Sequence, residues 1–274
     1  MTALIAALSY FKKGLCQGVK MKKIRVGTCG QVVSWAKFFL LFDALEINST
    51  FYRFPTDRQV KNWQKHLLSA KEKGAFISLK AHQLFTHPLR SPTWKRSEFG
   101  PEERGQLKGL VGCLKWNPFT EKQLKTTAEL ARSLGADFIL FQLPAACHNE
   151  REQVLPFFKE ALKRLPTRLG LEIRWEDLPL LEEASRLGVV PVFDPFLEEN
   201  LRESFFPSLP FLYLRLHGQK DARGRLNYKY RYTDEELLKL KEMLFEARAG
   251  EIVVLFNNVY MKEDALRFKE LISK

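Results

Sequence analysis

The chain has 274 residues, 45% of them hydrophobic, which is enough for a substantial core in one large domain or two small ones. Its 44 Lys and Arg exceed its 32 Asp and Glu, and the formal charge of +12 favours anionic partners such as nucleic acid, nucleotides and sugar phosphates. No apolar run approaches the roughly 20 residues that a membrane-spanning helix needs, so no membrane partner is expected.

Residues 1–20 are predicted to be a poorly structured N-terminal extension. The apolar patch over residues 3–8 is followed by Lys12 and Lys13, whereas a secretory signal has its charge before the apolar run. The four cysteines lie far apart without zinc-site or redox spacing, and their scarcity suits a reducing compartment. We therefore predict a cytoplasmic protein with one domain over residues 21–274.

Short apolar runs alternate with segments of helical period along this domain. The predicted strands are residues 24–28, 44–48, 75–80, 138–143, 169–174, 189–194, 211–217 and 252–257. The predicted helices are residues 35–42, 57–70, 121–134, 150–165, 179–187, 198–204, 234–249 and 262–273. Such alternation implies a parallel sheet, and eight units in about 250 residues match a (β/α)8 TIM barrel. A doubly wound open sheet is the alternative.

Side chains alternate between the two faces of a strand, so the leucines of the seventh strand identify its inward residues. Leu212, Leu214 and Leu216 form the set that faces the helices. The same test at the ends of the other strands gives the inward polar set: Glu46, Asn48, Ser78, Lys80, Gln142, Glu172, Arg174, Tyr213, Arg215 and His217, with Asp194 and Asn257 ending their strands. Barrel enzymes carry their active sites at this C-terminal mouth, so we predict a polar, ligand-binding mouth. A mutually neutralising network that only holds the barrel is the alternative.

Several motifs occur in an order that resembles the YecE-like family, also called domain of unknown function seventy-two. They are GTCG at residue 27, EINSTFYRF at 46, FQLP at 141, YLRLHG at 213, YRY at 230 and FNN at 256. The resemblance covers roughly residues 24–271 and implies a TIM barrel, but no established activity. The barrel of the family is similar to the metal-dependent group of xylose isomerases and endonuclease IV, an analogy of fold alone.

The chain departs from the family pattern in two places. Its GTCGQVVSW segment is shorter than the family's GTSGWSY-type segment, so the first loop between strand and helix looks truncated. Its EIRWED segment keeps Glu172 and Arg174 but lacks the histidine that follows the arginine in the family. A role that requires that histidine is therefore not expected.

The leading hypothesis is an enzyme or binding protein for a phosphate-containing ligand, with nucleic acid and a phosphodiesterase or nuclease reaction among the candidates. His217 would be a general acid or base because histidine titrates near neutrality, and Glu46 or Glu172 would orient water. The basic loop over residues 218–232 carries alternating tyrosines that could stack on bases. The predicted ligand-binding residues are Asn48, Tyr52, Arg53, Lys80, His87, Gln142, Arg174, Arg215, Tyr230, Arg231, Asn257 and Asn258.

Three other hypotheses stay open. Glu46 and Glu172 could serve a sugar-directed hydrolase or isomerase, because glycoside hydrolysis uses two carboxylates. A divalent metal could be held by Glu46, Glu172, Asp194 and His217, although no close-spaced motif supports it. A non-catalytic binding or scaffold protein would use the basic surface instead, and would tolerate loss of Glu172 and His217.

Overall fold

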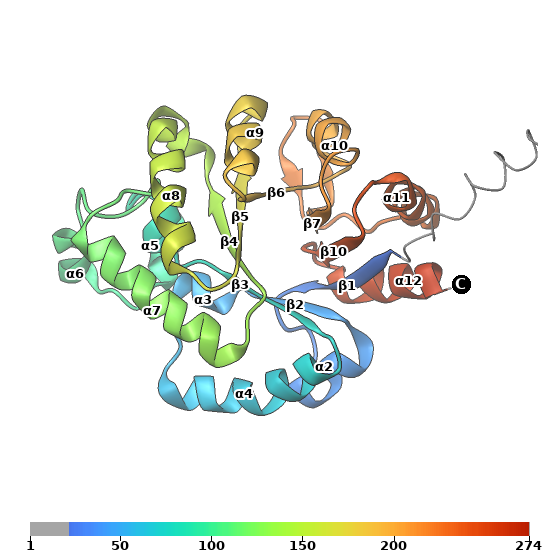
Figure 1. Cartoon of the computed structure of the whole chain (residues 1–274), viewed down its shortest axis with the longest axis horizontal. Coiled ribbons are helices and arrows are strands. Elements are labelled where there is room, and N and C mark those ends of the chain that lie inside the picture. The colour runs from blue at the N-terminus through green and yellow to red at the C-terminus, as the bar shows by residue number, and fades with distance from the viewer. Residues whose placement is uncertain (1–21, 274) are drawn as a thin grey trace, which may run out of the picture.

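Each of the eight apolar runs forms one strand of a closed parallel barrel (Figure 1). The computed structural model describes residues 22–273, so the extension predicted over residues 1–20 lies outside the described residues. The strands are β1 (Lys23–Cys29), β2 (Ala44–Ile47), β3 (Phe76–Lys80), β4 (Phe138–Leu143), β5 (Arg168–Ile173), β6 (Val190–Phe193), β7 (Phe211–Leu216) and β10 (Glu251–Phe256). They lie in chain order around the barrel, and β10 closes it by pairing with β1. This confirms the predicted (β/α)8 fold over the doubly wound sheet.

Helices surround the barrel on the outside (Figure 1). The main ones are α2 (Trp35–Leu41), α4 (Asp57–Glu72), α7 (Pro118–Leu134), α8 (Val154–Arg164), α9 (Leu178–Arg186), α10 (Glu199–Phe205), α11 (Asp234–Glu246) and α12 (Met261–Ser273). Short helices that the sequence did not predict are α3 (Ser49–Tyr52), α5 (Gln83–Thr86), α6 (Pro101–Gln106) and η1 (Pro92–Arg96). The end of η2 (Ala145–Gln153) overlaps the start of the helix predicted over residues 150–165. Within residues 22–273, no helix combines the length and the apolar character needed to cross a membrane.

Helix ends form where the residue types favour them. At the start of α11, the Thr233 side chain accepts a hydrogen bond from the Glu236 N–H at 3.2 Å, and the Glu236 carboxylate accepts from the Thr233 N–H at 2.9 Å. This reciprocal pair satisfies two backbone donors that the helix leaves open. Helix α7 ends at Gly135, whose φ of 63° lies in the left-handed region that glycine adopts without a steric penalty.

Alternation along each strand separates an outer core from an inner one. Leu212, Leu214 and Leu216 of β7 belong to the outer core between the strands and the helices. Tyr213 belongs to the inner core, and Arg215, two residues further on, points into the barrel as well. The leucine pattern therefore predicted the inward set of this strand correctly.

Aromatic rings fill the lower part of the barrel interior. The ring of Tyr213 stacks on that of Phe138 with centroids 4.2 Å apart, and Phe76 and Phe211 pack beside them. A Cβ atom at Gly170 would lie 2.2 Å from Phe138 Cζ, so the glycine makes room for this ring. Because the rings block the centre of the barrel, the polar side chains must lie above them, towards the C-terminal ends of the strands.

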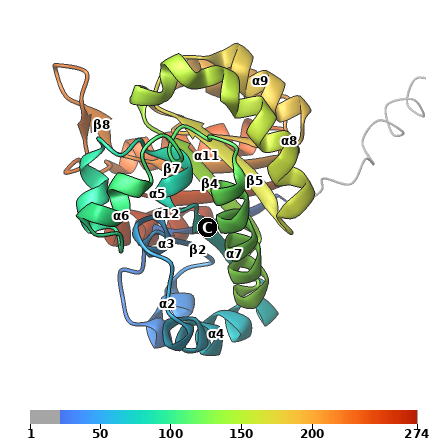
Figure 2. The ribbon, with the colours of Figure 1, turned by 90° about the vertical axis from the view of Figure 1, so that its left-hand side faces the viewer.

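Two long connections rise at that C-terminal end, which we call the mouth. One follows β3 and contains α5, η1 and α6. The other follows β7 and contains an antiparallel hairpin formed by β8 (Gln219–Lys220) and β9 (Leu226–Asn227). Figure 2 shows the hairpin and the α5–α6 connection projecting from the same end of the barrel. Both connections therefore border the mouth.

Candidate functional site

Arg215 lies at the centre of a buried ionic network inside the mouth. Its NH2 group donates to Glu46 Oε1 at 2.9 Å and its NH1 group donates to Glu172 Oε2 at 2.5 Å. The Tyr213 hydroxyl donates to the second oxygen of Glu46 at 2.7 Å and contacts Ser78 Oγ at the same distance. Since a guanidinium is always charged and only donates, it favours the ionised form of Glu172.

Arg174 extends this network to His217. Its NH2 group forms an ion pair with Glu172 Oε1 at 2.5 Å and lies 2.9 Å from His217 Nε2. Because Arg174 can only donate, His217 Nε2 accepts, and the proton of the neutral ring lies on Nδ1, 3.4 Å from Asp194 Oδ2. Burial, followed by the charge of Arg174, holds the pKa of His217 well below its ordinary value. The near-neutral pKa expected from the sequence is therefore not found.

The carboxyl groups of the mouth fall into two kinds. Burial alone would raise the pKa of Glu172, but Arg174 and Arg215 outweigh burial and hold that pKa below its ordinary value. Within residues 22–273, Asp194 and Glu198 form no ion pair with Arg or Lys within 4.0 Å, and burial outweighs the more distant charge of Arg174 and raises the pKa of each to about 7. The two acids are linked, because the Asp194 N–H donates to Glu198 Oε2 at 2.9 Å.

Glu198 is not among the site residues predicted from the sequence. It is the N-cap residue of α10, four residues beyond Asp194 at the end of β6. Its place in a connection that follows a strand was the available signal, since those connections form the mouth. With Arg174 and Lys220 it lines a cavity of about 380 Å³, and the hairpin forms one wall of that cavity.

Lys80 is a cation of the mouth that forms no ion pair with a carboxylate of the described residues. Its Nζ atom donates to Gln142 Oε1 at 3.2 Å and lies 4.3 Å from the centre of the Phe51 ring. Among the described residues, no carboxylate oxygen lies within 4.0 Å of this nitrogen. Burial, aided by the charge of Arg215, lowers the pKa of Lys80 to about 8, so the amine is mostly protonated at neutral pH.

His87 faces the same region from the connection after β3. Its ring packs edge-on against Phe51 with centroids 4.8 Å apart, and its Nδ1 atom lies 2.8 Å from Thr86 Oγ1. Burial and then the charges of Lys80 and Arg174 lower the pKa of His87 to about 3. His87 is therefore neutral, and its environment is positively charged.

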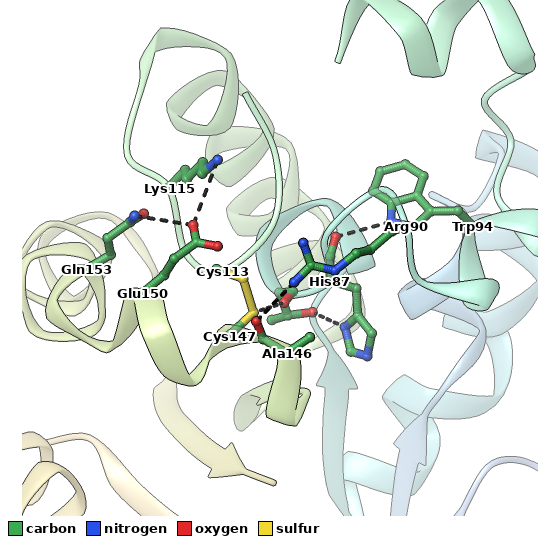
Figure 3. Close-up of a disulfide and its surroundings, with 10 residues drawn as sticks. His87, Arg90, Trp94, Cys113, Lys115, Ala146, Cys147, Glu150 and Gln153 are labelled. Atoms are coloured by element: carbon green, nitrogen blue, oxygen red, sulfur yellow. Dashed lines mark hydrogen bonds and ion pairs between the residues drawn. A yellow bond between two sulfur atoms is a disulfide. The ribbon is translucent and has the colours of Figure 1, made fainter. Parts of the chain in front are cut away.

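A disulfide fixes the connection that carries His87 (Figure 3). Cys113 and Cys147 are bonded although they are 34 residues apart, and Cys147 Sγ contacts the Thr86 carbonyl. Disulfides are rare in reducing compartments. The bond therefore does not support the reducing compartment expected from the cysteine content, and the cytoplasmic location stays a prediction.

Helix α3 turns three predicted ligand-binding residues away from this network. Strand β2 ends at Ile47, and Asn48 begins the helical turn. Asn48 Nδ2 donates to the Cys29 carbonyl at 2.9 Å. With Tyr52 and Arg53, Asn48 lines a separate pocket on the other side of α3. The sequence predicted Asn48 as an inward residue of the mouth, and Tyr52 and Arg53 as ligand-binding residues on its rim, because it did not predict α3.

The predicted residues after β7 and β10 mostly anchor loops. The Tyr230 hydroxyl donates to the Glu236 carboxylate, and Asn258 Nδ2 donates to the Tyr230 carbonyl at 2.9 Å and to Asp264 Oδ2 at 2.7 Å. Arg231 is exposed, and Asn257 is partly buried at the end of β10. These four residues thus lie around the mouth without joining the network of Arg215.

The carboxylates as they stand do not form a metal centre. The guanidinium of Arg215 lies between Glu46 and Glu172 and hydrogen bonds to both. Within residues 22–273, no group of three or more His, Cys, Asp or Glu side chains is arranged to hold a metal ion. The metal hypothesis therefore gains no support from the donor set, and we derive no chemistry through a metal.

Comparisons with known proteins identify a family. A family model described as "Protein of unknown function DUF72" matches residues 35–273. The crystal structure of a DUF72 family protein from Enterococcus faecalis has a TM-score of 0.65 and 19% identity, and the match covers 93% of this chain and 99% of that chain. No curated protein matches the chain.

More distant structures share the barrel. A xylose isomerase domain protein from Planctomyces limnophilus has a TM-score of 0.54 and 14% identity over 92% of this chain and 96% of that chain. The protein SacUVDE has a TM-score of 0.51 and 14% identity over 92% of this chain and 98% of that chain. At such low identity, these likenesses show the fold alone.

Proposed function

The chain belongs to the DUF72 family of unknown function, also called YecE-like, and we propose from the geometry of its site that the mouth binds a phosphate-containing ligand. Lys80 carries this proposal. It is a partly buried cation that hydrogen bonds to Gln142 and has no carboxylate within 4.0 Å in residues 22–273. A buried charge without a counter-ion is unfavourable, so an anion bound at this amine would stabilise it.

Neighbouring groups support an anionic ligand. Arg174 is 23% exposed, and together with Lys220 on the hairpin it lines the cavity of about 380 Å³ described above. Gln142 and His87 add uncharged polar groups close to Lys80. Guanidinium and ammonium groups are the usual protein donors to phosphate oxygens. In this proposal Glu46 and Glu172 position the arginines, and their predicted catalytic role stays a prediction.

The acid–base properties of the mouth favour this proposal over a sugar hydrolase. Glycoside hydrolysis needs one protonated carboxyl, whereas the arginines hold the pKa of Glu172 low. Glu198 is better suited to exchange a proton near neutrality, because its pKa is raised to about 7 and it lines the cavity with Arg174. If the ligand is hydrolysed, we propose Glu198 as the general acid or base.

Nucleic acid is the narrower form of the proposal, and the hairpin gives it partial support. The loop carries Arg223 and Lys229 on its exposed surface. Of its three tyrosines, Tyr228 is 42% exposed, whereas Tyr232 is 1% exposed and hydrogen bonds through its hydroxyl to Gly218. Tyr230 is partly buried, and its hydroxyl donates to Glu236. Base stacking would therefore depend mainly on Tyr228.

Calorimetric titration with inorganic phosphate and pyrophosphate tests the proposal. We expect Lys80→Gln to weaken binding by about tenfold or more, because the variant loses the charge but keeps a polar side chain. Lys125→Gln is the matched control, since Lys125 is exposed on α7. Equal affinity of the Lys80→Gln variant and the unchanged protein would refute the proposal. Filter binding of single-stranded and abasic DNA at low salt separates the nucleic-acid form, which retention at background level would exclude.

A further inference from the structure

A second pocket, which we call the side pocket, lies outside the barrel beside the end of β2. Its volume is about 890 Å³. Residues from α2, α3, α4 and η1 line it, together with the loops between them. Helix α3 separates it from the mouth: Phe51 of this helix packs against Lys80, whereas Tyr52 lines the side pocket. The two sites are therefore neighbours but not one cavity.

The connection after β1, which borders the side pocket, is short. Only residues 30–34 link β1 to α2, and α2 itself has seven residues. Gly30 and Gln31 of this connection form part of the pocket wall. The family model matches from residue 35 onwards, so this wall lies outside the matched segment. Membership of the family does not by itself predict the pocket.

Aromatic rings form the apolar part of the lining. Trp35 of α2 and Trp63 of α4 have ring centroids 6.2 Å apart at an interplanar angle of 43°. Both are partly exposed, and both line the pocket. The Trp35 ring also stacks on His66, with centroids 6.0 Å apart. A partly exposed indole such as that of Trp63 is a favourable stacking surface for a planar heteroaromatic ring.

Positive charge forms the polar part. The guanidinium of Arg96 lies 3.7 Å from the centre of the Tyr52 ring, and Arg53 Nε donates to the Arg96 carbonyl at 3.0 Å. These contacts hold the two arginines side by side, and in the described part of the chain neither forms an ion pair with a carboxylate within 4.0 Å. With Lys95, the lining has three cations against one acid, Glu98.

We propose that the side pocket is a second binding site, for a mononucleotide. Its base would stack on the partly exposed Trp63, beside Trp35, and its phosphate would bind Arg53 and Arg96. The ring and the phosphate would each contribute, because the aromatic and cationic parts of the lining belong to one pocket. The proposal concerns a site apart from the mouth and does not depend on what the mouth binds.

Calorimetry on the full chain with AMP, adenosine and inorganic phosphate tests it. We expect AMP to bind with a Kd below about 1 mM, and adenosine to bind at least about tenfold more weakly. Arg53→Ala and Arg96→Ala should each weaken AMP binding at least about fivefold, because each removes a phosphate donor. Both arginines are exposed, so loss of the fold is not expected. The matched control is Arg186→Ala on α9, which should change the affinity less than about twofold.

The Lys80→Gln variant separates the two sites. AMP binding at the side pocket should be unchanged in this variant, while phosphate binding at the mouth should weaken. AMP binding that is lost in Lys80→Gln but kept in both arginine variants would place the nucleotide in the mouth and overturn this inference. No AMP binding up to about 5 mM, or equal affinity in all variants, would also overturn it. Either of these results would leave the phosphate proposal for the mouth to be judged on Lys80 alone.

Discussion

Arg215 on β7 donates a hydrogen bond to Glu46 on β2 at 2.9 Å, and neither side chain is more than 1% exposed. The pair connects strands that are not neighbours in the barrel. Glu172 on β5 accepts a hydrogen bond from the other terminal nitrogen of Arg215, so one guanidinium joins three strands. This cross-link lies directly above the aromatic layer and closes the interior beneath the mouth.

Replacing Arg215 should therefore destabilise the barrel. Arg215→Met leaves Glu46 and Glu172 buried without their shared cation, and we expect the free energy of unfolding to fall by about 3–5 kcal/mol. Urea denaturation measures this change. Arg186→Ala, whose side chain is 72% exposed, should change it by less than about 0.5 kcal/mol. A loss below about 1 kcal/mol in Arg215→Met would show that the network does not depend on this arginine.

The barrel and its inward polar residues could be predicted because both follow from local periodicity. The alternation of leucines on β7 predicted that the Arg215 side chain points into the barrel. In the structure it does so, and there it contacts Glu46 and Glu172. A strand has a fixed period of two residues, so one apolar face determines the other. The inward residues of each strand can thus be predicted from the sequence of that strand alone.

Features that depend on the connections were not predictable in this way. Helix α3 begins directly after β2, and its turn sends Tyr52 into the side pocket instead of the mouth. The disulfide joins Cys113 to Cys147 across 34 residues, a contact set by the path of two loops. The raised pKa of Glu198 arises from burial in the folded chain. Each of these depends on tertiary position, which residue spacing does not encode.

Loss of the disulfide should lower stability substantially. The bond closes a loop between residues 34 apart, and the chain-entropy relation gives about 3–4 kcal/mol for a loop of that length. We expect the Cys113→Ser, Cys147→Ser double variant to lose about that much free energy of unfolding, measured by denaturation without reductant. Added reductant should destabilise the unchanged protein but not the double variant. Equal stability of the two proteins without reductant would contradict the predicted effect.

The raised pKa of Glu198 predicts a pH-dependent contribution to stability. Between its ordinary value of 4.5 and about 7, the folded protein binds more protons at this group than the unfolded chain does. Stability therefore falls as pH rises through that range. Relative to Glu198→Gln, the unchanged protein should lose on the order of 2 kcal/mol between pH 5 and pH 8. Denaturation at the two pH values measures this difference.

Two further variants' results test whether Glu198 causes this pH dependence: the dependence that remains in Glu198→Gln, and that of a control at an exposed glutamate. Asp194 has a raised pKa of its own, so part of the pH dependence should remain in the Glu198→Gln variant. The exposed residue Glu176 provides the control, and Glu176→Gln should leave the pH dependence unchanged. A difference between Glu198→Gln and the unchanged protein that is the same at pH 5 and pH 8 would mean that Glu198 is ionised in both conditions.

Protonation of Lys80 should control anion binding at the mouth. Its pKa of about 8 means that the ammonium is present below that pH and is lost above it. Sulfate is a suitable probe because its own charge does not change in this range. We expect sulfate affinity, measured by calorimetry, to fall about tenfold between pH 6.5 and pH 9.5. Lys80→Arg should bind sulfate with much less pH dependence, because a guanidinium stays charged throughout. If both proteins lose affinity equally, another group controls the binding, and Lys80 is not the cation that receives the anion.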